Sequence, residues 1–280
     1  MGARYITALT IAGSDSVGGA GIQADLKTMS ALGVYGASVI TALTAQNTAG
    51  VDGIMPATVD IVEQQIDAVF ADIRPDAVKT GMLFSAEIVA AVAARLRHHH
   101  AANIVVDPVM ISTSGSRLIA QDAIDTLVLQ LLPLATIVTP NKMEAECLAG
   151  MKISSYESLF EAGERILAKG ANAVLIKGGH FHADMMIDYL FESNGTPPQR
   201  FSAQIVATAN THGTGCTLSS AIASYLAMGK SLFEAVGWAK TYLSKALAAG
   251  AGADCWLGHG PVNHLFDPRP LSLKVSENDI

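Results

Sequence analysis

The sequence predicts an α/β protein with a mostly parallel central sheet and a small antiparallel edge. Two observations lead to this fold class. Apolar runs of strand length alternate with longer segments of helical period, which is typical of parallel strands joined by helices that cover both faces of the sheet. Late in the chain, two strand-like runs follow each other with only a turn-forming segment between them, which predicts a β-hairpin.

The expected elements follow one another along the chain, in most cases strand before helix. Apolar runs of strand length lie at Ile6–Ala12, Ala37–Leu43, Ala77–Thr80, Asn103–Val106, Thr136–Val138 and Ala173–Lys177. Longer stretches with apolar residues at helical spacing lie at Gly21–Leu32, Thr58–Phe70, Ala86–Arg97, Ile119–Leu132, Glu157–Lys169, Gly213–Ala227 and Leu232–Leu247. The hairpin strands are Met185–Phe191 and Gln199–Val206, and we expect them to form the antiparallel edge.

The length and composition indicate one folded domain. The chain has 280 residues, of which 50% are hydrophobic, and this is enough to bury a sizeable core. We expect residues 1–267 to form a single domain. Residues 268–280 begin with two prolines and continue with polar residues, so this tail is expected to be flexible.

Charge and cysteine content exclude several classes of function. The formal net charge is −7 and no long run of Lys or Arg occurs, so binding to nucleic acid or to an anionic membrane surface is not expected. No apolar stretch is long enough to span a bilayer. The widely spaced Cys147, Cys216 and Cys255 form neither a disulfide framework nor a zinc pattern. A reducing compartment, the cytoplasm, is therefore expected.

The segment Asn210–Cys216 opens an apolar helix and carries the strongest chemical signal. Gly213 and Gly215 allow backbone N–H groups to turn toward a ligand, and the helix start adds partial positive charge. With Thr214, they are expected to bind a phosphate or a transferring phosphoryl group. Cys216 lies in the first helical turn, where the pKa of a thiol falls, so it could accept a proton. A glycine-rich helix cap beside a buried cysteine explains the segment equally well by itself.

Two carboxylates that follow predicted strands are candidate magnesium ligands. Asp107 ends a strand and is followed by a proline, and Glu144 comes three residues after Asn141 on the same face of a helix. A plain capping box, in which Glu144 reaches back to the helix start, is the better interpretation of this pair alone. Combined with Asp107 and the anion-binding glycines, metal binding becomes the better interpretation.

Lys177 and Gln46 also follow predicted strands. Lys177 precedes a pair of glycines, and its ammonium could reach a nucleotide phosphate, although a lone lysine is usually only solvated. Gln46 offers a donor and an acceptor, which match the ring nitrogen and the amine of an aminopyrimidine. An exposed loop glutamine is the simpler interpretation of Gln46 by itself.

The segment Gly13–Asp25 forms a glycine-rich turn that leads into a helix. It lacks the Gly-Lys-Ser/Thr sequence of a P-loop. Gly19, Gly21 and Ala24 match a loose dinucleotide fingerprint, but the turn is too long and no acidic residue ends the next strand. Close backbone approach to a small planar substrate explains these glycines better.

Seven motifs occur in one order along the chain: Gly13–Asp25, Ala45–Thr48, Lys79–Met82, Asp107–Met110, Thr139–Asn141 with Glu144, Lys177–His180 and Thr211–Cys216. Together they resemble the hydroxymethylpyrimidine/phosphomethylpyrimidine kinases of thiamine biosynthesis, a family of the ribokinase-like superfamily. The resemblance extends from about Ile6 to about Asp267, which is nearly the whole chain. Each motif alone is modest, whereas the ordered set is highly specific.

The resemblance implies a three-layer α/β/α sandwich, the use of ATP and Mg²⁺, and two successive phosphorylations of a pyrimidine hydroxymethyl group at one site. It also implies a homodimer. The roles implied are pyrimidine binding for Gln46, with Gly13, Asp25 and Met82 nearby; an anion hole at Gly213, Thr214, Gly215 and Cys216, with Cys216 as the base; magnesium binding by Asp107 and Glu144; and ATP contacts by Lys177, Asn141, Thr211 and Lys240. The wider superfamily usually has Asp where this chain has Cys216.

Three alternatives stay open at this point. A pyridoxal or pyridoxine kinase shares the scaffold and acts on a heterocycle that bears a hydroxymethyl group. A dinucleotide-dependent oxidoreductase would need an acid after the second strand, which is absent. A non-catalytic nucleotide-binding regulator would bind ATP without turnover. The small polar segment Ser112–Ser116 is expected to close over the site and exclude water.

Overall fold

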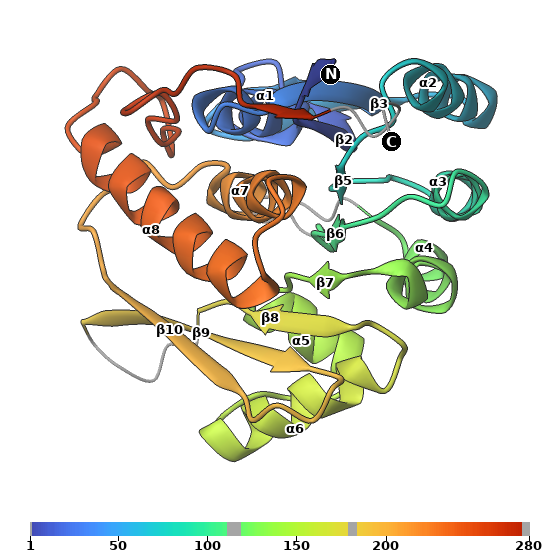
Figure 1. Ribbon diagram of the computed structural model, residues 1–280. Coiled ribbons are helices and arrows are strands. Elements are labelled where there is room, and N and C mark those ends of the chain that lie inside the picture. Colours follow the sequence, from blue (N-terminus) through green and yellow to red (C-terminus); the bar gives the residue numbers. More distant parts are fainter. Residues whose placement is uncertain (1, 111–118, 179–183, 276–280) are drawn as a thin grey trace.

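The computed structural model describes residues 2–110, 119–178 and 184–275. One large sheet forms its middle layer, and helices cover both faces (Figure 1). In spatial order the strands are β10 (Gln199–Gln204), β9 (Met185–Glu192), β8 (Ala173–Ile176), β7 (Ile137–Val138), β6 (Ile104–Val106), β5 (Ala77–Thr80), β2 (Thr7–Ser14), β3 (Tyr35–Gln46) and β4 (Val51–Pro56). The six strands from β8 to β3 are parallel neighbours, as the alternating pattern predicts.

The helices divide into two layers. One face carries α1 (Gly21–Ala31), α7 (Thr214–Ala227) and α8 (Leu232–Gly250), and the other carries α2 (Val59–Asp72), α3 (Ala86–His98), α4 (Gln121–Thr126), α5 (Lys142–Ala149) and α6 (Tyr156–Leu167). Each layer has its own buried apolar cluster against the sheet. The three-layer architecture is therefore confirmed.

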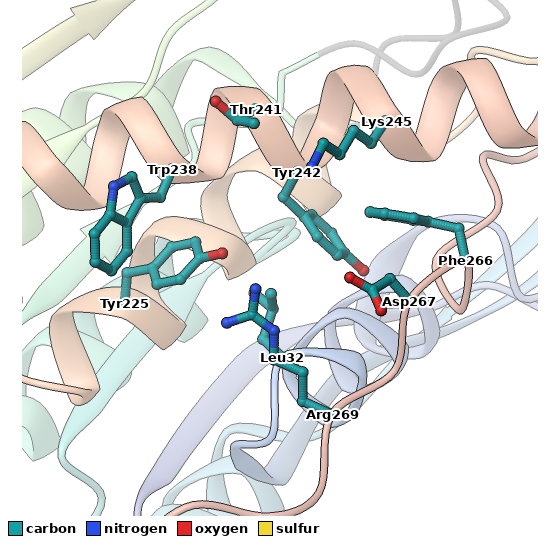
Figure 2. A pocket seen from close by; sticks show the side chains of 9 residues that line it. All are labelled: Leu32, Tyr225, Trp238, Thr241, Tyr242, Lys245, Phe266, Asp267 and Arg269. Atoms are coloured by element: carbon teal, nitrogen blue, oxygen red, sulfur yellow. The ribbon is translucent and has the colours of Figure 1, made fainter.

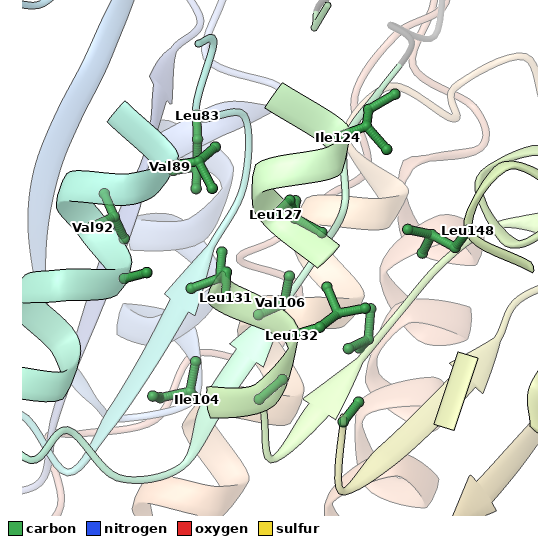
Figure 3. Packing of buried hydrophobic residues seen from close by; sticks show 14 of the residues in the cluster. Leu83, Val89, Val92, Ile104, Val106, Ile124, Leu127, Leu131, Leu132 and Leu148 are labelled. Carbon is green, nitrogen blue, oxygen red and sulfur yellow. The ribbon is translucent and has the colours of Figure 1, made fainter. Parts of the chain in front are cut away.

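The predicted helix at Ile119–Leu132 is a composite. After α4, the chain continues as a π-helical stretch, Leu127–Leu131, and a short 3₁₀ turn, Leu132–Leu134. Figure 3 shows Leu127 and Leu131 of this stretch packed in the same cluster as Val89 and Val106. Pro133 has no backbone N–H to donate, so it interrupts the hydrogen bonds of the preceding helix and is accommodated at the start of the 3₁₀ turn.

The sheet has antiparallel strands at both ends, whereas the sequence indicated only one such edge. The β9–β10 hairpin forms the predicted edge. At the opposite end, β4 pairs antiparallel with β3, and this strand was missed because Gly53 and Pro56 interrupt any strand-like run. Both residues are tolerated because β4 is an edge strand.

Residues 268–275, which were expected to belong to a flexible tail, are bonded to the rest of the domain. Strand β11 (Leu273–Val275) pairs antiparallel with β1 (Ala3–Tyr5), and Lys274 Nζ lies 2.6 Å from Asp76 Oδ1. The tail is therefore tied to the N-terminal strand by backbone and side-chain bonds. Residues 276–280 lie outside the described part.

No helix within the described ranges combines the length and the apolar character needed to cross a bilayer.

Candidate active site

Two glycine-rich loops touch at the carboxyl edge of the sheet. Gly213 caps the start of α7 with a φ of 77°, in the left-handed region that favours glycine. A Cβ atom at Gly213 would overlap the carbonyl oxygen of Gly19, which belongs to the turn before α1. Gly213 therefore allows the Gly13–Asp25 turn and the Asn210–Cys216 segment to meet.

Asp15 and His212 join these two loops. Asp15 Oδ2 accepts hydrogen bonds from Gly19 N at 3.0 Å, Ala20 N at 2.8 Å and His212 Nε2 at 2.8 Å. Asp15 Oδ1 accepts a further bond from Val17 N at 3.1 Å. Burial alone raises the pKa of Asp15, but the bonds from His212 and the backbone outweigh it and hold the pKa below its ordinary value.

We predict that Asp15→Ala lowers the free energy of unfolding by about 1–3 kcal/mol, because buried donors on both loops lose their acceptor. Urea unfolding measures the change, and Asp52→Ala on the exposed edge strand is the matched control. A change no larger than that of the control would show that Asp15 does not hold the loops together.

Asp107 is the centre of a buried polar cluster at the tips of β6, β7 and β8. Its Oδ1 accepts hydrogen bonds from Lys177 Nζ at 3.0 Å and Thr139 Oγ1 at 3.1 Å, and its Oδ2 accepts one from Ser219 Oγ at 3.2 Å. Although burial raises the pKa of Asp107, the charges of Lys177 and Lys79 lower it below the ordinary value. Asp107 is therefore a carboxylate at neutral pH.

The anion-binding turn faces this cluster. A Cβ atom at Gly215 would lie 3.5 Å from Lys177 Nζ and 3.6 Å from Asp107 Oδ2. Lys177 is 15% exposed at its side chain, so its ammonium borders the space in front of the turn. Burial lowers the pKa of Lys177, but the carboxylates of Asp107 and Glu144 raise it above its ordinary value. The turn and a permanently charged lysine thus share one site.

Asn141 and Glu144 form a complete capping box at the start of α5. Glu144 N donates to Asn141 Oδ1 at 3.0 Å, and Asn141 N donates to Glu144 Oε2 at 2.8 Å. The structural interpretation of this pair is therefore correct, but Glu144 also belongs to the polar cluster. Its burial raises its pKa to about 7, the Lys177 charge opposes this, and the Asp107 charge adds to it.

The donor set at Asp107 and Glu144 fits magnesium. Among the described residues no group of three or more His, Cys, Asp or Glu side chains converges on one point. Two carboxylates suffice for a magnesium ion that keeps several waters and binds ATP oxygens. A cation beside Glu144 would also favour the ionised form that burial disfavours.

Cys216 does not have the lowered pKa that its place at a helix start suggested. Burial raises the pKa of its thiol to about 11, and the charges of Asp25 and Asp107 add to this, against the opposing charge of Lys79. The Gly21 N–H, which donates toward the sulfur, lowers the pKa only in part. Cys216 is thus a protonated thiol at neutral pH before ligands bind.

Asp25 lies beneath the site and not on its surface. Both Asp25 and Lys79 are fully buried, and Lys79 Nζ lies 2.7 Å from Asp25 Oδ2. Thr10 Oγ1 donates to the same oxygen at 2.6 Å, and Ser220 donates to the other. Asp25 was expected near the pyrimidine; in the structure its buried carboxylate joins α1, β5 and α7.

The remaining predicted substrate residues lie together. A Cβ atom at Gly13 would lie 2.5 Å from the methyl group of Met82, so the two residues are in contact. Gln46 N donates to Ser16 Oγ at 3.3 Å, and Gln46 Oε1 accepts from Thr44 Oγ1 at 3.2 Å. The end of β3 is thus fixed to the same glycine-rich turn.

Lys240, which was expected near the nucleotide, is largely buried and pairs with Asp188. Its Nζ lies 2.6 Å from Asp188 Oδ2, and Asp188 Oδ1 accepts from Gly178 N at 2.9 Å. Lys240 therefore supports the turn that follows Lys177. Thr211 is partly exposed, and its carbonyl accepts from Thr214 N at 3.3 Å, directly before the anion-binding turn. His180 and the segment Ser112–Ser116 lie outside the described residues.

The structure reveals residues that sequence reasoning missed. Asp15, His212 and Lys79 all lie within the recognised motifs, but their partners are up to 197 residues away along the chain. Their presence in motifs was the available signal. Ser219 gave no signal beyond its place one helical turn after Gly215.

The protein belongs to the class of small-molecule kinases with a ribokinase-like fold. Three features define this class: the parallel α/β sheet, the glycine-rich turn at a helix start, and the Lys–Asp pair beside a buried Glu. The family model for phosphomethylpyrimidine kinase matches residues 15–263. The chain belongs to the phosphomethylpyrimidine kinase family.

Curated relatives agree with this family. The chain is 50% identical over 262 residues to the hydroxymethylpyrimidine/phosphomethylpyrimidine kinase of Salmonella typhimurium, covering 93% of this chain and 98% of that protein. It is 53% identical over 260 residues, or 92% of this chain, to the thiamine biosynthesis bifunctional protein ThiED of Geobacter sulfurreducens. The match spans 52% of that longer protein.

Solved structures show the same fold. Phosphomethylpyrimidine kinase of Clostridium difficile has a TM-score of 0.76 at 47% identity, covering 86% of this chain and 99% of that chain. Pyridoxal kinase of Staphylococcus aureus, solved with AMP-PCP and pyridoxal, has a TM-score of 0.83 at 35% identity, covering 96% and 98%.

Proposed function

We propose that this chain is an ATP-dependent kinase of thiamine biosynthesis that phosphorylates 4-amino-5-hydroxymethyl-2-methylpyrimidine to the monophosphate and then to the diphosphate. The observation that carries the proposal is the contact between the Gly213–Cys216 turn and the cluster of Asp107 and Lys177. The relatives at about 50% identity supply the substrate class. The enzyme is expected to act in the cytoplasm as a homodimer.

The transferring phosphoryl group is held by charge and position. The backbone N–H groups at Gly213–Cys216 and the Lys177 ammonium stabilise the negative charge of the group in flight. Asn141 and Thr211 lie beside the nucleotide. Asp107 and Glu144 would hold Mg²⁺, which neutralises charge on the ATP oxygens.

The pyrimidine is placed by the opposite wall of the site. The Gln46 amide pairs with the ring nitrogen and the exocyclic amine, since it offers one acceptor and one donor group. Gly13 and Met82, which contact each other, lie beside the ring. Asp25 acts from below, where it fixes the starting turn of α1 through its bonds to β2 and β5.

Cys216 is the proposed acceptor of the hydroxyl proton in the first phosphorylation. The second step starts from a phosphate that is already ionised, so it needs little help from a base. We predict that Cys216→Ala slows the first phosphorylation far more than the second. Single-turnover assays with each substrate measure this, and equal slowing of both steps would mean that Cys216 only shapes the turn.

The pKa of Cys216 adds a pH test to the same assay. Because the thiolate forms only as pH rises toward about 11, the wild-type first step is expected to accelerate about tenfold per unit of pH above neutrality. The second step and the Cys216→Ala variant are expected to lack this rise.

Pyridoxal kinase is the second candidate, favoured by the TM-score of 0.83 to the Staphylococcus aureus enzyme. The lower identity to that enzyme, 35% against 47%, favours the pyrimidine. Side-by-side ADP-release assays on both alcohols decide between them. The proposal expects the larger kcat/KM for the hydroxymethylpyrimidine, and the reverse order would contradict it. ATP binding without turnover on either would indicate a regulator.

A further inference from the structure

A cavity of about 310 Å³ lies between α8, the C-terminal end of α7 and the segment that follows α8 (Figure 2). Its walls are unusually aromatic, and charged side chains stand at its rim. The lining residues are Leu32, Tyr225, Trp238, Thr241, Tyr242, Lys245, Phe266, Asp267 and Arg269. A cavity of this size and composition is large enough for a one- or two-ring small molecule.

This cavity is separate from the active site. Tyr225 lies nine residues after Cys216 on α7, so at 1.5 Å per residue it is about 13 Å away along the helix axis. On α8, Trp238, Tyr242 and Lys245 are offset from Lys240 by roughly 140–200° at 100° per residue. They therefore occupy the face of α8 opposite to Lys240, which supports the turn after Lys177.

Tyr225 has a largely buried ring and a hydroxyl that is open to the cavity. The residue is 4% exposed, and its hydroxyl makes no hydrogen bond to any of the described residues. Its ring is held edge-on by Trp238, with centroids 5.3 Å apart. In Figure 2 the hydroxyl points into the cavity toward the Arg269 guanidinium. The hydroxyl is therefore available to donate or accept a hydrogen bond with a molecule in the cavity.

The charged side chains around Tyr225 favour a negatively charged ligand. Within the described part of the chain, the side chains of Arg269, Lys245 and Asp267 form no ion pair, although Arg269 is close enough to lower the pKa of Tyr225 against the effect of burial. The lining therefore has a formal charge of +1 on a protein whose net charge is −7. Arginine is suited to planar carboxylates and phosphates.

The aromatic side chains of the cavity favour a ligand with a flat ring. Tyr242 is fixed by its hydroxyl, which donates to the His264 carbonyl at 2.6 Å, and Phe266 packs against it with centroids 5.3 Å apart. Trp238 is 42% exposed at the mouth. Such rings bind other rings by stacking or edge contacts.

We propose that this cavity is a second binding site, distinct from the active site, for a small planar aromatic molecule that carries a carboxylate or phosphate. The ring lies among Trp238, Tyr242 and Phe266. The acidic group accepts hydrogen bonds from the Tyr225 hydroxyl and the Arg269 guanidinium. The proposal stands whether or not the pyrimidine is the substrate of the active site.

Naphthalene-2-carboxylate is a suitable probe, and calorimetry on the full chain with saturating AMP-PCP and hydroxymethylpyrimidine keeps the active site occupied. We expect one molecule to bind per chain. Arg269→Gln and Tyr225→Phe should each weaken binding, the former about tenfold or more, because a hydrogen bond to a charged group is lost. Arg165→Gln, on the distant α6, is the matched control and should bind as the wild type does.

Three outcomes would overturn the proposal. The first is no binding at roughly 1 mM probe. The second is binding that Arg269→Gln and Tyr225→Phe leave unchanged in variants that melt like the wild type. The third is equal affinity for the neutral naphthalene-2-carboxamide, which would mean that the cavity recognises only the ring.

Discussion

Replacing Lys177 with methionine is expected to slow phosphoryl transfer by about 10²–10³-fold, the usual cost of one preorganised electrostatic contact. The methionine keeps most of the apolar stem, so the change removes mainly the charge. The Lys177 ammonium lies 3.0 Å from Asp107 and borders the Gly215 turn. Its side chain is partly exposed, so its charge can reach a bound phosphate. Single-turnover rates at saturating ATP measure the effect.

Lys152→Met is the matched control. Lys152 also pairs with a carboxylate, that of Glu146, but its side chain is 89% exposed. The control is expected to leave the rate unchanged. Thermal melting of both variants separates lost chemistry from lost folding, since Asp107 loses its partner in Lys177→Met. A Lys177→Met enzyme that turns over within tenfold of the wild type would remove Lys177 from the mechanism.

Asp25→Ala is expected to destabilise the protein by about 3–5 kcal/mol, which is the typical result of stranding one partner of a buried ion pair. Lys79 is 0% exposed and has Asp25 as its hydrogen-bond partner among the described residues. The buried ammonium would then be left without its carboxylate partner. Guanidinium unfolding, followed by circular dichroism, gives the change in free energy.

Two further variants serve as controls for the unfolding measurement. Glu161→Ala breaks the exposed pair with Arg165 and should cost no more than about 0.5 kcal/mol. The double variant Asp25→Ala/Lys79→Met removes both charges and should regain part of the stability lost in the single variant. A single variant as stable as Glu161→Ala would show that the buried pair is not what joins the layers.

Much of the fold could be predicted because periodicity records burial directly. The six parallel strands and the long helices have apolar runs that their burial demands. Strand β4 and the β1–β11 pair could not be predicted, because their residues are largely exposed and their pairing depends on backbone bonds to distant segments. The pairing of the C-terminal tail with β1 could not be predicted either, because the polar composition of the tail does not indicate which strand it pairs with.

The site could be predicted as a set of segments but not as a set of contacts. Parallel strands bring their carboxyl ends to one edge, so Asp107, Glu144 and Lys177 converge as expected. Burial decided the rest. Asp25 and Lys240 are buried and support neighbouring elements. Burial also raises the pKa of Cys216, although a helix start lowers the pKa of a thiol. No local pattern in the sequence reports how deep a side chain lies.

The most direct test of the account follows the products by ³¹P NMR, with ATP, Mg²⁺ and 4-amino-5-hydroxymethyl-2-methylpyrimidine as the starting mixture. The account predicts that a phosphate monoester signal rises first and is then replaced by a diphosphate ester, with a second ADP formed for each pyrimidine. ATP that stays intact with this alcohol while pyridoxal is phosphorylated under the same conditions would contradict it.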